Sequence, residues 1–223
     1  MELQIQNGKR ALFYLMLIMC LPLYGEQTFK SRSGHVSLIE LYTSEGCSSC
    51  PPADRVFTSL TANGGLWSVF VPVAFHVDYW NTPWRDPLSA SEFTSRQAAY
   101  GRGLVTPDLV VNGERSSAWN QISQGAYSNS NQTGTLVVRH ENDQRYAIVF
   151  QPTSKMNQGL VAHVALLGFG ISYDVTSGEN AGKTLTHDFA VLSIDSANLN
   201  HADGYYTGIA ELPLQKLKHP VGE

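Results

Sequence analysis

The chain has 223 residues, of which 43% are hydrophobic and 15% charged, and its formal net charge is −4. A mildly acidic chain without a run of lysines and arginines is not expected to bind nucleic acid. Its three cysteines are too few for a scaffold held by several disulfides, so a hydrophobic core must supply the stability. The length allows one large or two small domains with cores of their own.

The N-terminal segment has the pattern of a secretory signal peptide, which we predict over residues 1–25. Lys9 and Arg10 precede an uncharged apolar run, 11–23, that is shorter than the roughly 20 residues needed to span a bilayer. An uncleaved anchor and a lipoprotein leader modified at Cys20 are the alternatives. In all three cases the folded part lies outside the cytoplasm, so we expect a periplasmic or secreted protein that leaves the membrane after signal cleavage.

The first half, from residue 34 to 127, alternates strand and helix patterns. Short apolar, β-branched runs predict strands at 36–42, 69–77 and 109–111. Between them, helices are predicted from Pro52 onward and from Ser89 or Ser91 to Arg102. The third strand ends at Asn112-Gly113, a turn signal. This order predicts a βαβ unit followed by a hairpin.

The second half, from residue 134 to 215, contains strand patterns separated by turns and no helix pattern. The expected strands are 135–140, 145–151, 160–168, 186–194 and 204–211. The segment 178–184 is interpreted as a long hairpin loop of this half. The predicted fold class is therefore an α/β domain followed by a small antiparallel β-sandwich-like domain, α+β overall.

Two of the three cysteines form the motif Cys47-Ser48-Ser49-Cys50-Pro51, directly after the first predicted strand. Thiols at this spacing can close a small disulfide ring and open it again, as a dithiol redox site requires. Cys47 is expected just before a helix, where free N–H groups and the helix dipole favour a thiolate. The hydroxyls of Ser48 and Ser49 can donate hydrogen bonds to that thiolate.

Strand, Cys-x-x-Cys, helix, strand, helix and Thr106-Pro107 before a strand together resemble the thioredoxin-like superfamily. The resemblance implies a thioredoxin-like first domain, with Cys47 as nucleophile, Cys50 as resolving thiol, and a cis bond at Pro107 facing the dithiol. The tryptophan that precedes the first cysteine in thioredoxins is replaced by Gly46, which leaves the direction of electron flow open.

More narrowly, the chain resembles an uncharacterised secreted thioredoxin-like family, known as a domain of unknown function. The segments that carry this resemblance are 40–54, 75–80, 85–87, 96–97 and 178–182. They span nearly the whole chain after the leader. A family of this kind implies a fold but no established activity.

Acidic residues near the motif are candidates for supporting roles. Glu40 is a candidate proton acceptor for the resolving thiol, or else an exposed or salt-bridged strand residue. Its spacing from Cys47 differs by one residue from that of the usual acid, which reverses its face on a strand. Glu45 and Asp54 flank the cysteines and are expected to be solvated or helix-capping charges.

His76 and Asp78 end the second predicted strand, at the sheet edge where sites gather in α/β proteins. They are candidates for acid–base chemistry, and the alternative for His76 is a hydrogen-bonded strand-end residue. A metal site formed by Cys47, Cys50 and His76 is a further alternative.

Three functions are compatible with these patterns. The first is a thiol–disulfide oxidoreductase that acts on protein or peptide thiols and disulfides without a cofactor. The second is a metal-binding module that uses Cys47, Cys50 and His76. The third is a non-catalytic binding module in which the disulfide is only a structural clamp.

Overall fold

The computed structural model describes residues 27–123, 131–142, 144–156 and 158–212. The predicted signal peptide, with Cys20, lies outside these residues. Within them, no helix has both the length and the apolar character needed to cross a membrane.

The described residues 27–123 form five strands, three α-helices and one 3-10 turn. They are β1 (Gln27–Lys30), β2 (Ser37–Thr43), α1 (Pro51–Ser59), η1 (Leu60–Ala62), β3 (Phe70–His76), α2 (Ser91–Ala98), β4 (Asp108–Val111), β5 (Glu114–Arg115) and α3 (Trp119–Ser123). The parallel pair β2–β3 with α1 between them confirms the predicted βαβ unit. β4 pairs antiparallel with β2 and turns into β5 at Asn112-Gly113, both with positive φ, as the turn signal predicted.

The second half consists of strands in its described part. They are β6 (Gly134–Asn142), β7 (Arg145–Pro152), β8 (Leu160–Gly168), β9 (Ile171–Asp174), β10 (Thr184–His187), β11 (Ala190–Ala202) and β12 (Tyr205–Glu211). The segment 178–184 does lie in a hairpin, which joins β9 to β10.

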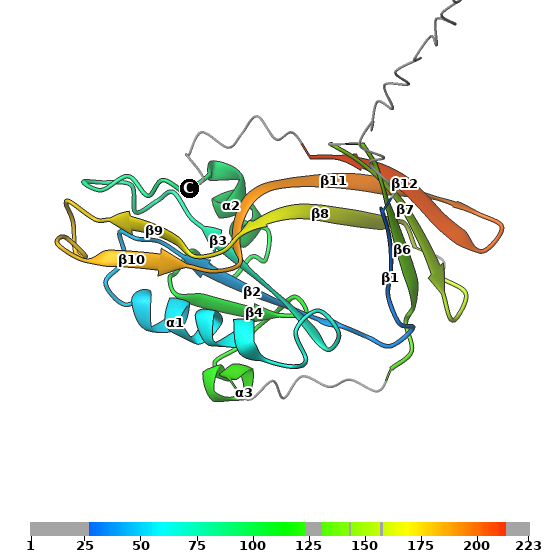
Figure 1. Cartoon of the computed structure of the whole chain (residues 1–223), viewed down its shortest axis with the longest axis horizontal. Coiled ribbons are helices and arrows are strands. Elements are labelled where there is room, and N and C mark those ends of the chain that lie inside the picture. The colour runs from blue at the N-terminus through cyan, green and yellow to red at the C-terminus, as the bar shows by residue number, and fades with distance from the viewer. Residues whose placement is uncertain (1–26, 124–130, 143, 157, 213–223) are drawn as a thin grey trace, which may run out of the picture.

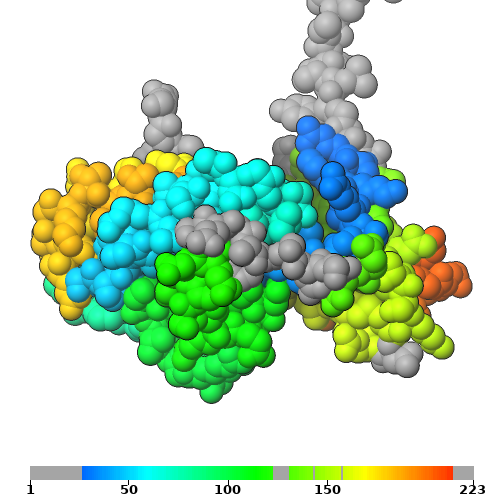
Figure 2. Space-filling model, turned by 90° about the horizontal axis from the view of Figure 1, so that it is seen from below, coloured from blue at the N-terminus to red at the C-terminus, as the bar shows by residue number. Residues whose placement is uncertain are grey.

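One mixed ten-stranded sheet runs through both halves, in the order β1-β6-β7-β12-β11-β3-β2-β4-β5 with β8 paired to β11. The shared strand is β11. It begins parallel to β3, where Ala190 lies opposite Ala74, and then continues as the antiparallel partner of β8 and β12. In Figure 1, β8 and β11 extend side by side from the helical end to the all-β end. Figure 2 shows the helical end and the all-β end of the molecule from below.

The predicted fold class is wrong. The molecule is mostly β, with a single large mixed sheet and three short α-helices in the described part, and not a helix-rich α/β domain followed by a separate small sandwich. The reason lies at residues 186–194, for which the sequence pattern predicts one strand of the second half. The chain instead leaves β10 at His187, places Phe189 in the first half's core, and starts β11 beside β3.

The described residues form three buried apolar clusters. The side chains of β2 alternate between two of them, because successive residues of a strand point to opposite faces. Ile39 and Leu41 pack under α1 and α3, whereas Tyr42 packs on the α2 side. The third cluster, around Ile148 and Ala210, lies at the all-β end. Because side chains of β2 alternate between the α1 face and the α2 face, only those on the α1 face lie on the side of the cysteines.

Candidate functional site

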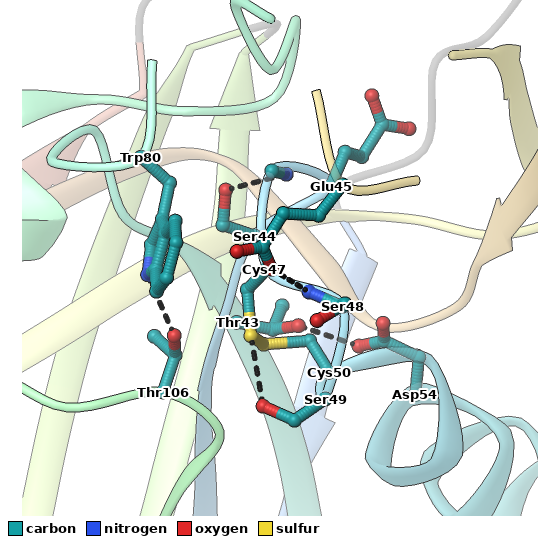
Figure 3. Close-up of a disulfide and its surroundings, with 12 residues drawn as sticks. Thr43, Ser44, Glu45, Cys47, Ser48, Ser49, Cys50, Asp54, Trp80 and Thr106 are labelled. Carbon is teal, nitrogen blue, oxygen red and sulfur yellow. Dashed lines mark hydrogen bonds between the residues drawn. A yellow bond between two sulfur atoms is a disulfide. The ribbon is translucent and has the colours of Figure 1, made fainter. Parts of the chain in front are cut away.

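Cys47 and Cys50 form a disulfide at the start of α1 (Figure 3). Cys50 is the N-cap residue of the helix, and its N–H donates to the Cys47 carbonyl over 3.2 Å. The Cys47 sulfur lies 3.3 Å from the Ser49 hydroxyl, whereas the Ser48 main-chain N–H donates to the carboxylate of Glu179. Cys47 is 1% exposed and Cys50 is fully buried, so the ring is covered in this state.

Trp80 closes one side of the ring. A Cβ on Gly46 would lie 2.7 Å from the Trp80 carbonyl oxygen, so only glycine permits this approach. The Trp80 indole donates to the Thr106 hydroxyl over 2.8 Å, which brings the segment before Pro107 to the site. The structure confirms that the Thr106–Pro107 bond is cis.

The other side is closed by a hairpin from the second half, which we call the arm: β9, β10 and the loop 175–183 between them. At its tip, the fully buried Asn180 donates from Nδ2 to the carbonyls of Glu45 and Cys47, over 2.7 and 2.9 Å. Next to it, Glu179 accepts from the Ser48 N–H over 2.9 Å. Hydrogen bonding by the Ser48 side chain, and secondly by this N–H, lowers the pKa of the Glu179 carboxyl. Three hydrogen bonds therefore hold the cysteine loop against the arm.

Glu45 is a fully buried carboxylate between the cysteine loop and the arm. One of its oxygens accepts from Trp84 Nε1 over 2.8 Å, and the other lies 2.9 Å from Nε2 of His187 at the end of β10. Its main-chain N–H donates to Asp86 over 2.8 Å. The expectation that Glu45 is a solvated or capping charge is therefore wrong.

A second histidine–carboxylate pair lies beside the first. Nδ1 of His76 lies 2.7 Å from Asp86, and its ring meets the His187 ring edge to face at 4.6 Å. Burial would lower the pKa of His76, but the Asp86 carboxylate outweighs it and raises that pKa. Burial would likewise raise the pKa of Asp86, but the His76 charge and hydrogen bond lower it. His76 is thus a hydrogen-bonded residue at the strand end.

Asp54, on the first turn of α1, is buried beside the disulfide and not exposed as a capping charge. Its carboxylate accepts from the Thr43 hydroxyl over 2.9 Å, and the two groups point toward each other next to Cys50 (Figure 3). Burial raises the pKa of Asp54, although the charges of His187 and His76 oppose that shift. A buried acid with a raised pKa is suited to accept a proton from a thiol.

Glu40 and Asp78 are not brought to the disulfide. Glu40 faces the α2 side, where it is buried and bonded to Arg96 at 2.8 Å and to Tyr42 and Tyr100, so it is a salt-bridged strand residue. Asp78 follows the end of β3 and accepts from Thr94 of α2 over 2.6 Å. The spacing of Glu40 from Cys47 differs by one residue from that of the usual acid, so its side chain points to the opposite face of β2, away from the disulfide.

The described residues contain no group of three His, Cys, Asp or Glu side chains arranged to hold a metal ion. Cys47, Cys50 and His76 are therefore not assembled as a ligand set in this state, in which both sulfurs belong to the disulfide.

Sequence reasoning missed the contributions of the arm. Glu179, Asn180 and His187 lie more than a hundred residues beyond the cysteines, and only the resemblance of 178–182 to a family segment pointed to that loop. Buried Glu45 and Asp54 lie inside segment 40–54, one of those that carry the family resemblance. Nothing in the sequence showed that partners distant in the chain would bury them.

The arm predicts a measurable effect of Asn180. Asn180→Ala removes two hydrogen bonds that hold the loop, each worth about 1 kcal/mol, so reduction of the disulfide by dithiothreitol should be about tenfold faster or more. Ser172→Ala is the matched control, because it removes a hydrogen bond of the same arm, to Thr186, at a pair of exposed side chains. Equal reduction rates in the wild type and Asn180→Ala would show that the arm does not control access to the ring.

Comparison with known proteins gives a family and two similar structures. A family model described as "Protein of unknown function (DUF1223)" matches residues 38–219. A structural-genomics crystal structure of an Agrobacterium tumefaciens protein is similar at 24% identity, over 83% of this chain and 81% of that one, with a TM-score of 0.59. HBP35 of Porphyromonas gingivalis is similar at 16% identity, over 82% of this chain and 66% of that one, with a TM-score of 0.55.

At these identities the two structures support the fold alone, and the search of curated proteins found no match. The family match covers most of the chain and includes the cysteine loop, Asp54, Trp80 and the arm. The chain therefore belongs to the DUF1223 family.

Proposed function

We propose that this protein is a periplasmic or secreted thiol–disulfide oxidoreductase that acts on protein or peptide disulfides. The observation that carries the proposal is the Cys47–Cys50 ring at the N-terminus of α1, immediately after a buried strand. This local motif resembles that of thioredoxin-like proteins. Helix N–H groups and dipole there stabilise a thiolate at Cys47.

The exchange consists of two displacements. The Cys47 thiolate attacks one sulfur of a substrate disulfide, which forms a mixed disulfide and releases the other substrate sulfur as a thiolate. The Cys50 thiolate then attacks the Cys47 sulfur, closes the ring and releases the second substrate thiolate. Two electrons pass to the substrate, and the Cys50 proton goes to the Asp54 carboxylate. The reverse sequence oxidises a substrate dithiol.

An apolar surface beside the ring supports a polypeptide as substrate. Tyr79, Leu104 and Val105 are 39%, 44% and 48% exposed, although large apolar side chains are normally buried. They lie near Thr106, because Gln97 is hydrogen-bonded both to the Tyr79 hydroxyl and to the Val105 carbonyl. A folded or unfolded chain that presents a disulfide can make apolar contacts at this place.

The burial of the ring favours a second candidate function. A disulfide that is 1% exposed at one cysteine and fully buried at the other has the properties of a structural clamp. In the oxidoreductase, the arm tip must move away from Cys47 before a substrate sulfur can reach it.

A glutathione redox titration, with alkylation and mass analysis, separates these functions. An oxidoreductase should have a midpoint between about −270 and −120 mV, and Cys47 should be alkylated first in the reduced protein. Cys47→Ser should abolish the exchange and leave the fold intact. A midpoint below about −300 mV, together with a Cys47→Ser variant that is only less stable, would identify a clamp and contradict the proposal.

The role of Asp54 can be tested on the second displacement. Reduced protein treated with DTNB forms Cys47–TNB, and the attack of Cys50 then releases a second TNB. Asp54→Asn should slow this second release about tenfold or more and remove the acid inflection from its pH profile.

Glu40→Gln is the matched control, since it also neutralises a buried carboxylate in this half, but on the other face of β2. A second release that is equally fast in Asp54→Asn and Glu40→Gln would exclude Asp54 as the proton acceptor.

A further inference from the structure

Each of the two buried histidines near the disulfide leaves one ring nitrogen unused. His187 bonds Glu45 through Nε2, and His76 bonds Asp86 through Nδ1. The second nitrogens, Nδ1 of His187 and Nε2 of His76, are buried and have no hydrogen-bond partner within the described part of the chain. Buried polar atoms without a partner are rare and call for an explanation. The exchange steps themselves use neither ring.

The two carboxylates determine how the rings are protonated. An ionised carboxylate can only accept, so the bonded nitrogen of each ring carries a hydrogen, and the unused nitrogen is the one that can bind a further proton. A carboxylate held against an imidazole also stabilises the imidazolium that forms. Burial lowers the pKa of His76, but the charge and hydrogen bond of Asp86 outweigh burial and raise that pKa. The carboxylates therefore favour positively charged rings.

Asp54 lies next to these rings. The rings contact each other edge to face at 4.6 Å, and Asp54 and His187 line the same pocket between α1 and β10. Burial raises the pKa of Asp54, and the charges of His187 and then His76 oppose the rise. A carboxyl group that is already protonated cannot accept a proton, so Asp54 needs this opposing charge in order to act as a base.

The other cationic groups near Asp54 are less favourably placed. The remaining ionisable groups around the two rings come from the cysteine loop, α1, the loop after β3 and the arm, and they are Glu45, Arg55, Asp86, Tyr173 and Lys183. Three of them are acidic. Arg55 is exposed, so water screens its charge, and Lys183 bonds the Asn180 side chain. Among the described residues, the two rings therefore supply the positive charge that acts most directly on Asp54.

We propose that His187 and His76 are positioning residues for the thiol exchange. Held by Glu45 and Asp86, the two charged rings keep Asp54 ionised, so that it takes the proton of Cys50 when the Cys50 sulfur attacks Cys47. The rings themselves give up no proton in that step. This role rests on the proposed function, because it concerns the second displacement. Through His187, the arm supplies a residue to the reaction as well as a cover for the disulfide.

The test uses two substitutions that keep the hydrogen bond of each ring and remove its charge. His187→Gln places an amide N–H near the position of Nε2, and His76→Asn places one near the position of Nδ1, so each variant can still donate to its carboxylate. The release of the second TNB from Cys47–TNB is followed as a function of pH. Without the opposing charge the pKa of Asp54 rises, so the acid inflection of each variant should move to higher pH by about half a unit or more. On the acid side, release should then slow about threefold or more.

His163→Gln is the matched control, because it removes an exposed imidazole that bonds Ser196, and it should leave the inflection at its wild-type pH. If the rings act through Asp54, His187→Gln should not slow the release further in an Asp54→Asn background. An unmoved inflection in either ring variant, or a uniform slowing at every pH, would overturn the proposal and leave the histidines a structural role. If the wild type releases no second TNB at all, the proposed exchange itself fails, and this role with it.

Discussion

The structure of the site depends on one buried charge, the carboxylate of Glu45. It lies in the loop before the cysteines and has no exposure, so it must be satisfied by neighbours. Trp84 and His187 satisfy its oxygens, and Asp86 accepts from its N–H. These partners come from two other segments, the loop after β3 and the arm, and Glu45 therefore fixes the cysteine loop, the loop after β3 and the arm relative to one another.

This constraint explains why the second half takes part in the site. His187 lies at the end of β10, and the chain continues from there through Phe189 into the core and into β11 beside β3. The base of the arm is thus anchored by a buried polar contact and by apolar packing. Its tip, with Asn180, lies over the cysteine ring as a consequence. The arm therefore covers the disulfide.

The local elements around the motif could be predicted from sequence because they depend on short-range patterns. β2, α1, β3 and β4 follow from apolar runs and helix signals, Asn112-Gly113 from turn chemistry, and the cis bond at Pro107 from a family resemblance. The fold class could not be predicted, because it depends on β11 being shared between two sets of strands. The run 186–194 looks the same whether it forms one strand or two.

The chemistry of the site was predictable only in part, for a related reason. The two cysteines could be identified as a candidate site from their Cys-x-x-Cys spacing alone. Burial of Glu45 and Asp54 instead depends on His187, Asn180 and Thr43, whose positions arise from tertiary packing. A charged residue in a loop is usually solvated, so the sequence favoured that interpretation. The Glu40 side chain was placed correctly by strand alternation, but its partner Arg96 was not identified.

The most direct test of this account is a double-mutant cycle on Glu45 and His187, with unfolding free energies of the wild type, Glu45→Gln, His187→Asn and the double variant. If this contact holds the arm to the cysteine loop, the two substitutions should be non-additive, with a coupling free energy of about 1.5 kcal/mol or more. Effects that add within about 0.5 kcal/mol would contradict it, because the loop and the arm would then be held independently.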